Sequence, residues 1–274
     1  MLKGEIKRAL TGKGMLVALL IGALCVYYKS SEYFNNFEYC NMYLKSVVNP
    51  DAQWFETFND ENFWVRWFPN NLGPHDMYLF YFMGIIVTLP FGISYFMDVK
   101  SGLVKNICTR TGRTTYLRSK YIATFIAGGI VNVFPLLIDF LYIRLVIPVD
   151  NWELCNRYLA INEDWKVLMI EHPYIAALIV AVLWFVFGGA LATIALAVSC
   201  VSKNVFTIQL VPFLVMLVDF EFEARFPVKY QKWFPIQFLR THNSIIWTGF
   251  IVSAVMICLT YMVFVVWQSK RDIL

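Results

Sequence analysis

Residues 98–120 read DVKSGLVKNICTRTGRTTYLRSK, and the topology of the whole chain follows from them. The segment is strongly basic, with the single acid Asp98 against six bases: Lys100, Lys105, Arg110, Arg113, Arg118 and Lys120. It is too charged to cross a bilayer, yet a long apolar run ends just before it at Met97 and another begins just after it at Tyr121. We therefore expect residues 98–120 to form a cytoplasmic elbow between two membrane spans.

An amphipathic pattern lies inside this elbow. Val104, Ile107 and Cys108 recur at helical spacing, whereas Lys105 and Arg110 fall on other faces. The pattern predicts a short helix at the membrane surface.

The composition of the chain indicates a polytopic membrane protein. Of its 274 residues, 59% are apolar, 18% are aromatic and only 15% are charged, with a mean hydropathy of +0.57. The first apolar run follows a basic start and has no cleavage-like site, so we expect it to be retained as a span. The six cysteines include no C-x-x-C pair, which argues against a zinc or redox motif.

Hydropathy predicts an all-helical chain with six transmembrane helices. Residues 1–13 pattern as an amphipathic helix resting on the cytoplasmic surface. The expected spans cover about 14–28, 77–97, 121–147, 174–198, 205–218 and 244–267. Extracellular segments are expected at 29–76, 148–173 and 219–243, the last with short re-entrant or interfacial helices.

Two of these spans carry special residues. Pro90 and Gly92 should break the second span. The fourth is rich in small residues that let helices approach closely, namely Gly188, Gly189, Ala190 and Ala192.

The distribution of charge fixes the orientation. The proposed inner side holds 13 of the 23 bases but only three of the 19 acids, Glu5, Asp98 and Asp272. Inside loops of membrane proteins carry this bias. Both termini are therefore expected in the cytoplasm, and the protein in a bacterial cytoplasmic membrane.

The order of these features resembles the permease subunits of type-2 ATP-binding-cassette (ABC) transporters. The likeness covers nearly the whole chain: a basic surface helix, six spans, Asp98-x-x-Ser101-Gly102 at the exit of the second span, and Arg113-x-x-Tyr116-Leu117-x-x-Lys120 leading into the third. In that family the segment between the two motifs is a coupling helix. One departure is the first outside segment, 29–76, which is longer than in many members and points to a particular substrate or partner class.

The resemblance implies a transport subunit with no catalytic residues of its own. The chain lacks the G-x-x-x-x-G-K-[ST] loop that cradles phosphates, so ATP and Mg²⁺ would be bound by a separate ATPase subunit. That ATPase would dock on the elbow, with the apolar stripe inserted into a groove. The docking residues are expected to be Gly102, Val104, Lys105, Ile107, Cys108, Arg110 and Arg113.

Simpler interpretations stay open at both basic segments. The elbow also fits a loop that orients the protein and touches lipid headgroups. The N-terminal helix fits either a membrane anchor or an ATPase contact.

Acidic residues near the outer side are candidates for a translocation path or gate. Asp139 and Arg144 lie in the outer half of the third span, where ions are costly and often functional, although each also fits a snorkelling or interhelical role. Asp219, Glu221 and Glu223 alternate with aromatic residues and fit either an acidic gate or a helix cap.

Cysteines and histidines give weaker signals. Cys40 and Cys155 are the cysteines placed outside, and either a disulfide or two free thiols fits them. The three histidines lack metal-ligand spacing, so no metal site is expected.

Other function classes fit less well. No H-E-x-x-H or G-x-S-x-G motif supports a membrane enzyme, and no internal repeat supports a secondary transporter. A receptor or immunity protein that binds a peptide through 29–76 remains an alternative.

The favoured function is an ABC exporter permease. It would pair with a second permease copy or a related chain, in the lipid bilayer, and would export an amphipathic substrate. A membrane-active peptide is the first expectation by analogy with relatives that handle bacteriocins and lantibiotics. No nucleic-acid partner is expected.

Overall fold

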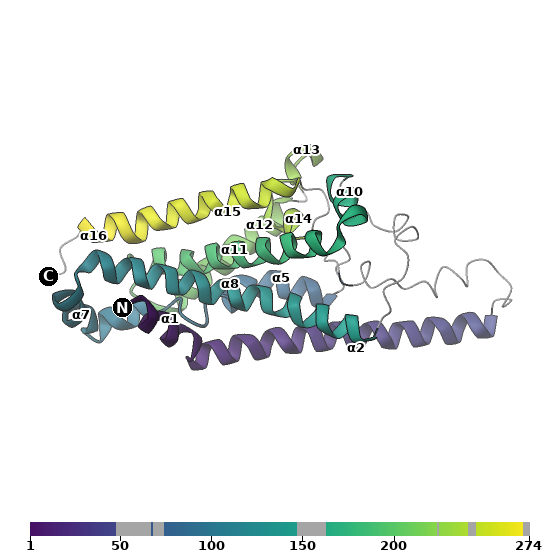
Figure 1. Cartoon of the computed structure of the whole chain (residues 1–274), viewed down its shortest axis with the longest axis horizontal. Coiled ribbons are helices and arrows are strands. Elements are labelled where there is room, and N and C mark those ends of the chain that lie inside the picture. Colours follow the sequence, from purple (N-terminus) through teal and green to yellow (C-terminus); the bar gives the residue numbers. More distant parts are fainter. Residues whose placement is uncertain (48–66, 68–73, 147–162, 224, 241–244, 271–274) are drawn as a thin grey trace.

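The computed structural model describes residues 1–47, 67, 74–146, 163–223, 225–240 and 245–270. That part of the chain is helical, and its long helices run roughly along one axis (Figure 1). In chain order the elements are α1 (Leu2–Leu10), α2 (Lys13–Val47), α5 (Pro74–Ile86), α6 (Ser94–Lys100), α7 (Leu103–Thr111), α8 (Arg113–Val146), α10 (Glu163–Glu171), α11 (Pro173–Ser199), α12 (Val205–Glu223), α13 (Val228–Gln231), α14 (Pro235–Leu239), α15 (Ile246–Tyr261), the π-helix η1 (Met262–Trp267) and α16 (Gln268–Lys270).

Within the described residues, five helical stretches are long and apolar enough to cross a membrane. They are Lys13–Ser31, Arg113–Leu145, Pro173–Ser199, Val205–Glu223 and Ile246–Trp267. This confirms the prediction of an all-helical, multi-pass membrane protein.

The segment predicted as the second span is not one helix. α5 ends at Ile86, a run of turns occupies residues 87–93, and α6 begins at Ser94. Pro90 lies in that run, and proline supplies no backbone N–H to continue a helix. The expected break is therefore present, and it leaves two helices that are each too short to cross a membrane alone.

The first long helix extends past its predicted end. α2 continues to Val47, about 19 residues beyond Tyr28, where the first span was expected to end. No glycine or proline occurs between residues 29 and 47, so only polarity changes there and nothing stops the helix.

The centre of the bundle is the close pair α8 and α11, the two most buried of the long helices. Small residues make this contact. A Cβ added at Gly128 would collide with Ala192, and one added at Gly188 would collide with Asn132. The prediction that the small residues of 188–192 allow close helix packing is confirmed.

Buried polar side chains then join this pair to α15. The Tyr121 hydroxyl lies 2.8 Å from the Thr260 hydroxyl, which lies 2.9 Å from that of Thr193. Three helices thus share one hydroxyl cluster whose members satisfy one another away from water.

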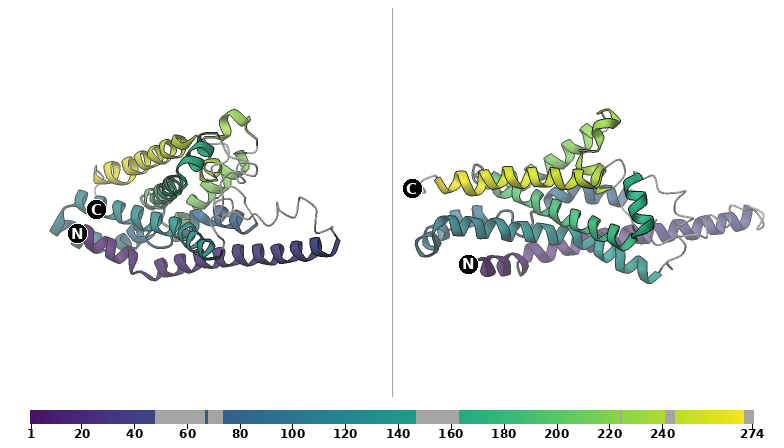
Figure 2. Two further views of the ribbon diagram at one scale, coloured as in Figure 1. Left: turned by 45° about the vertical axis from the view of Figure 1, so that its right-hand side comes forward. Right: turned by 45° about the horizontal axis from the view of Figure 1, so that its top comes forward.

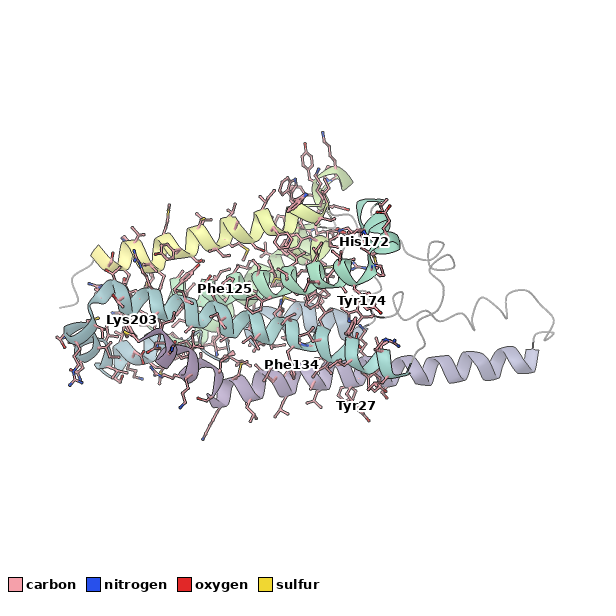
Figure 3. The ribbon with its side chains drawn as sticks, viewed as in Figure 1. Tyr27, Phe125, Phe134, His172, Tyr174 and Lys203 are labelled. Atoms are coloured by element: carbon pink, nitrogen blue, oxygen red, sulfur yellow. The ribbon has the colours of Figure 1, made fainter. Side chains whose placement is uncertain are left out.

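The two ends of the bundle differ. α1, α7 and α16 lie together at one end, whereas α10, α13 and α14 lie at the other, and the further views agree (Figures 1 and 2). Lys203 lies at the α7 end, and His172 and Tyr174 lie at the opposite end (Figure 3). The short helices predicted between the last two spans are α13 and α14. We call the end that holds α7 the basic end.

Candidate functional site

α7 is a separate helix held between two glycines. Gly102 precedes it with φ +71° and Gly112 follows it with φ +76°, and a Cβ at either position would meet only open space. Crowding therefore does not explain these glycines. The left-handed backbone, which glycine adopts without strain, does. The predicted short helix of the elbow is therefore present, with a sharp turn at each end.

The apolar face of α7 points inward, against the chain's own helices. Val104 is 2% exposed, and Ile107 and Cys108 pack partly buried beside it. The cluster that receives them is formed by Tyr95, Tyr116, Leu117, Tyr121, Leu196, Phe264 and Val265. Helical periodicity predicts an apolar stripe but not what covers it. Here the chain's own helices cover it, and the docking of this stripe on an ATPase stays a prediction.

The opposite face of α7 is free. Lys105, Asn106, Thr109 and Arg110 are exposed, and they occupy neighbouring positions on one side of the helix. Gly102 is exposed at the first turn, and Arg113 is half-buried at the start of α8. Of the predicted docking residues, Gly102, Lys105 and Arg110 are exposed, and docking on them stays a prediction.

Beneath α7, a buried ion pair joins the two helices that flank it. The Lys120 ammonium on α8 lies 2.5 Å from Asp98 Oδ2 on α6, and the two side chains are 0% and 1% exposed. The Tyr116 hydroxyl donates to the same carboxylate at 2.7 Å. The ammonium also lies 4.4 Å from the centre of the Phe91 ring. The Asp98–Lys120 pair therefore holds together the two helices, α6 and α8, that flank α7.

The N-terminal helix joins the same cluster through two further contacts. The Arg8 guanidinium donates to both carboxylate oxygens of Asp98, at 2.7 and 3.2 Å. Lys120 Nζ donates to Glu5 Oε2 at 3.0 Å. The two bases and two acids balance in charge, which offsets the burial of Glu5, Asp98 and Lys120. We call Glu5, Arg8, Asp98, Tyr116 and Lys120 the ionic clasp.

The electrostatics of the ionic clasp favour the charged form of Asp98. Burial by itself would raise the pKa of this carboxyl, but the hydrogen bonds from Arg8 and Lys120 outweigh it and leave the pKa below its ordinary value. A lowered pKa stabilises the fold above the unfolded value of about 3.9 and loses that contribution as the pH falls through the folded pKa. The contribution of the Asp98 carboxylate is therefore present at neutral pH.

The predicted path and gate residues lie elsewhere. Asp139 pairs with Lys29 of α2 at 2.9 Å, which joins α2 to α8. Arg144 is exposed. Asp139 is 3% exposed, so the interhelical role fits its position, and a role in the path stays a prediction.

Two of the three acids near the end of α12 bind the short helix α14. Asp219 accepts a hydrogen bond from the Ile236 backbone N–H at 3.1 Å, and Glu223 accepts one from the Gln237 amide. Glu221 is exposed. The helix-cap alternative fits Asp219, and the acidic gate stays a prediction.

The remaining predicted site is a disulfide. Cys155 and the side chain of Cys40 lie outside the described residues, so that pairing stays a prediction. Over the residues that the structure describes, no group of three or more His, Cys, Asp or Glu side chains could hold a metal ion.

Sequence reasoning missed Glu5, Arg8 and Lys29 as partners. Glu5 gave one signal, because it is the lone acid in a basic amphipathic helix.

No protein-family model, curated protein or solved structure matches this chain.

Proposed function

We propose that this protein is the permease subunit of an ABC exporter, driven by a separate ATPase. The observation that carries the proposal is α7. It is set off between two left-handed glycines, exposes a polar face, and rests on a buried clasp that fixes the helices on both of its sides. A partner that pushes on α7 would therefore move α6 and α8 with it, because the Asp98–Lys120 pair resists separation.

The six-span topology belongs to the same proposal. α5, the turns at 87–93 and the part of α6 up to Met97 together form the remaining crossing, as a broken helix packed on its neighbours. α5 lies against α12 and α2, and Gly84 meets the backbone of Pro212. An even number of crossings also agrees with α1 and α16 lying at one end (Figure 1).

An amphipathic cargo fits the apolar surface between α2 and α5. An apolar cavity of about 220 Å³ lies between α2 and α5, lined by Ile21, Cys25, Phe82, Ile85, Ile86 and Leu89. This pocket is partly open, and its lining is almost entirely apolar, so it suits hydrocarbon groups better than polar ones. We assign the cargo to the amphipathic peptides that the family resemblance implies, moved along a seam with a second permease. The receptor alternative depends on a segment that lies largely outside the described residues.

Co-purification tests the proposal directly. We expect an ATPase to be recovered with the chain from its native membrane in mild detergent, identified by mass spectrometry. Asn106→Trp with Thr109→Trp places bulk on the free face of α7, and we expect it to lower the recovery about ten-fold, or about 1.4 kcal/mol of binding. Lys203→Trp is the control, because it places an exposed tryptophan at the same end but outside α7. Recovery of no ATPase with the wild type contradicts the proposal.

Labelling tests the orientation. Thr109→Cys is exposed on α7, so a membrane-impermeant maleimide should modify it in inverted vesicles and spare it in intact cells. Mass spectrometry of the labelled peptide separates this thiol from the native cysteines. Modification in intact cells would place α7 outside and overturn both the orientation and the docking site.

A further inference from the structure

We infer that the surface which docks on α7 is rich in carboxylates, and that it belongs to the ATPase subunit rather than to lipid. This inference rests on the proposed function and names the chemistry of the partner's surface. Three features of the basic end carry it: where the acids lie, where the bases lie, and which way the apolar side chains point.

The two acids of residues 1–13 and 98–120 are both turned inward. Glu5 and Asp98 are the only acids in residues 1–13 and 98–120. They are 7% and 1% exposed, and the clasp neutralises each of them. Neither carboxylate is available to offset the positive charge of the surface.

The bases are divided in the opposite way. Lys120 is buried and paired inside the clasp, and Arg8 is paired with Asp98. The exposed bases of these two segments that lie outside the clasp are Lys3, Lys7, Lys13, Lys100, Lys105, Arg110 and Arg118. Because the acids are internal, the outer field of this end is positive, and a negative surface would be drawn to it.

α1 belongs to this surface as well as α7. The Thr111 hydroxyl, at the end of α7, lies 3.2 Å from the Met1 sulfur at the start of α1. The lysines of α1 therefore add to the field around α7 without needing to contact the partner themselves.

The direction of the apolar side chains decides between lipid and protein. A helix that binds a membrane surface inserts its apolar face into the headgroup boundary. α7 has turned that face inward through Val104, and no large apolar side chain from residue 100 to residue 121 is exposed. Its free face offers charge and hydrogen bonds alone. Ion pairing with an acidic protein surface uses both.

The test uses the full-length chain purified from its native membrane, washed at rising salt. We expect the ATPase to elute as ionic strength rises from about 0.05 to about 0.5 M, because screening shortens the reach of exposed charges. Lys105→Glu with Arg110→Glu should release it even at low salt, by at least about ten-fold. Two controls should retain it: Asn106→Ala with Thr109→Ala on the same face, and Lys229→Glu on α13 at the opposite end of the bundle.

A zero-length carbodiimide cross-link gives the second readout. The reagent activates a carboxylate, and a lysine amine within ion-pair distance then attacks it to form an amide. We expect a cross-linked peptide that joins Lys105 to an Asp or Glu of the ATPase. Lys105→Arg keeps the charge and the co-purification but removes the amine, so the cross-link at this position should vanish.

Each other outcome overturns a defined part. If no ATPase is recovered with the wild type, the proposed function fails. If the ATPase stays bound to the charge-reversed variant and at high salt, the carboxylate surface is wrong and the permease proposal stands. If that variant instead loses co-purified anionic phospholipid while it keeps the ATPase, the basic face binds lipid headgroups.

Discussion

Asp98→Ala should be the most damaging substitution in the ionic clasp. Asp98 accepts from Arg8, Tyr116 and Lys120, and its removal leaves all three without that acceptor. Removing one partner of a buried ion pair costs about 3–5 kcal/mol, since the other charge stays buried. We expect α1 to detach and the thermal unfolding midpoint in detergent to fall.

A double substitution makes this prediction specific. Asp98→Ala with Lys120→Met removes one acid and one base and leaves Glu5 and Arg8 balanced in charge. The loss of stability in the double variant should therefore be clearly smaller than the sum of the two single losses. Strict additivity would show that the buried pair contributes nothing.

The detachment of α1 has its own readout. Ala9 is fully buried against Phe91, Ala123 and Ala127, so a cysteine at position 9 should resist thiol reagents in the intact protein. With Asp98→Ala it should react readily, whereas Thr114→Ala, at an exposed position, should change nothing. An unreactive cysteine in the Asp98 variant would mean that the Glu5–Lys120 pair and the apolar contacts suffice to hold α1.

The sequence predicted those features that depend on the residue type at a position and on its near neighbours in the chain. The elbow helix, the break at Pro90 and the close packing at Gly188 all follow from residues within a few positions of one another. Proline and glycine act through the backbone itself, so their effects survive in any fold. These features needed no knowledge of the neighbouring helices.

Long-range pairing was beyond such rules. Lys120 and Glu5 are 115 residues apart, and the elbow lysine gives no sign in the sequence that it is buried rather than exposed. The same limit applied to Val104. Its periodicity predicted an apolar stripe, but not that the chain's own helices cover this stripe. Which apolar surface covers a helix depends on where the other helices lie, and periodicity does not contain that information.

Gly188→Leu should disrupt the centre of the bundle. Even the first carbon of the new side chain would overlap Asn132, so α8 would have to move away from α11. That shift would also break the hydrogen bond from the Asn132 amide to the Trp184 carbonyl, which is 2.7 Å long and buried. Overpacking costs about 1–3 kcal/mol and an unsatisfied buried polar group about as much again. We expect little folded protein in detergent extracts, measured by size-exclusion chromatography.

Gly4→Leu is the matched control for this prediction. It makes the same chemical change in a helix, but a Cβ at Gly4 meets no atom within 4 Å. Leucine is also the better helix former, so any loss seen only at position 188 comes from the contact and not from the loss of a glycine. Equal yields of the two variants would show that α8 and α11 can separate without cost. The close pair would then not be the rigid centre on which the movement of α7 and α8 depends.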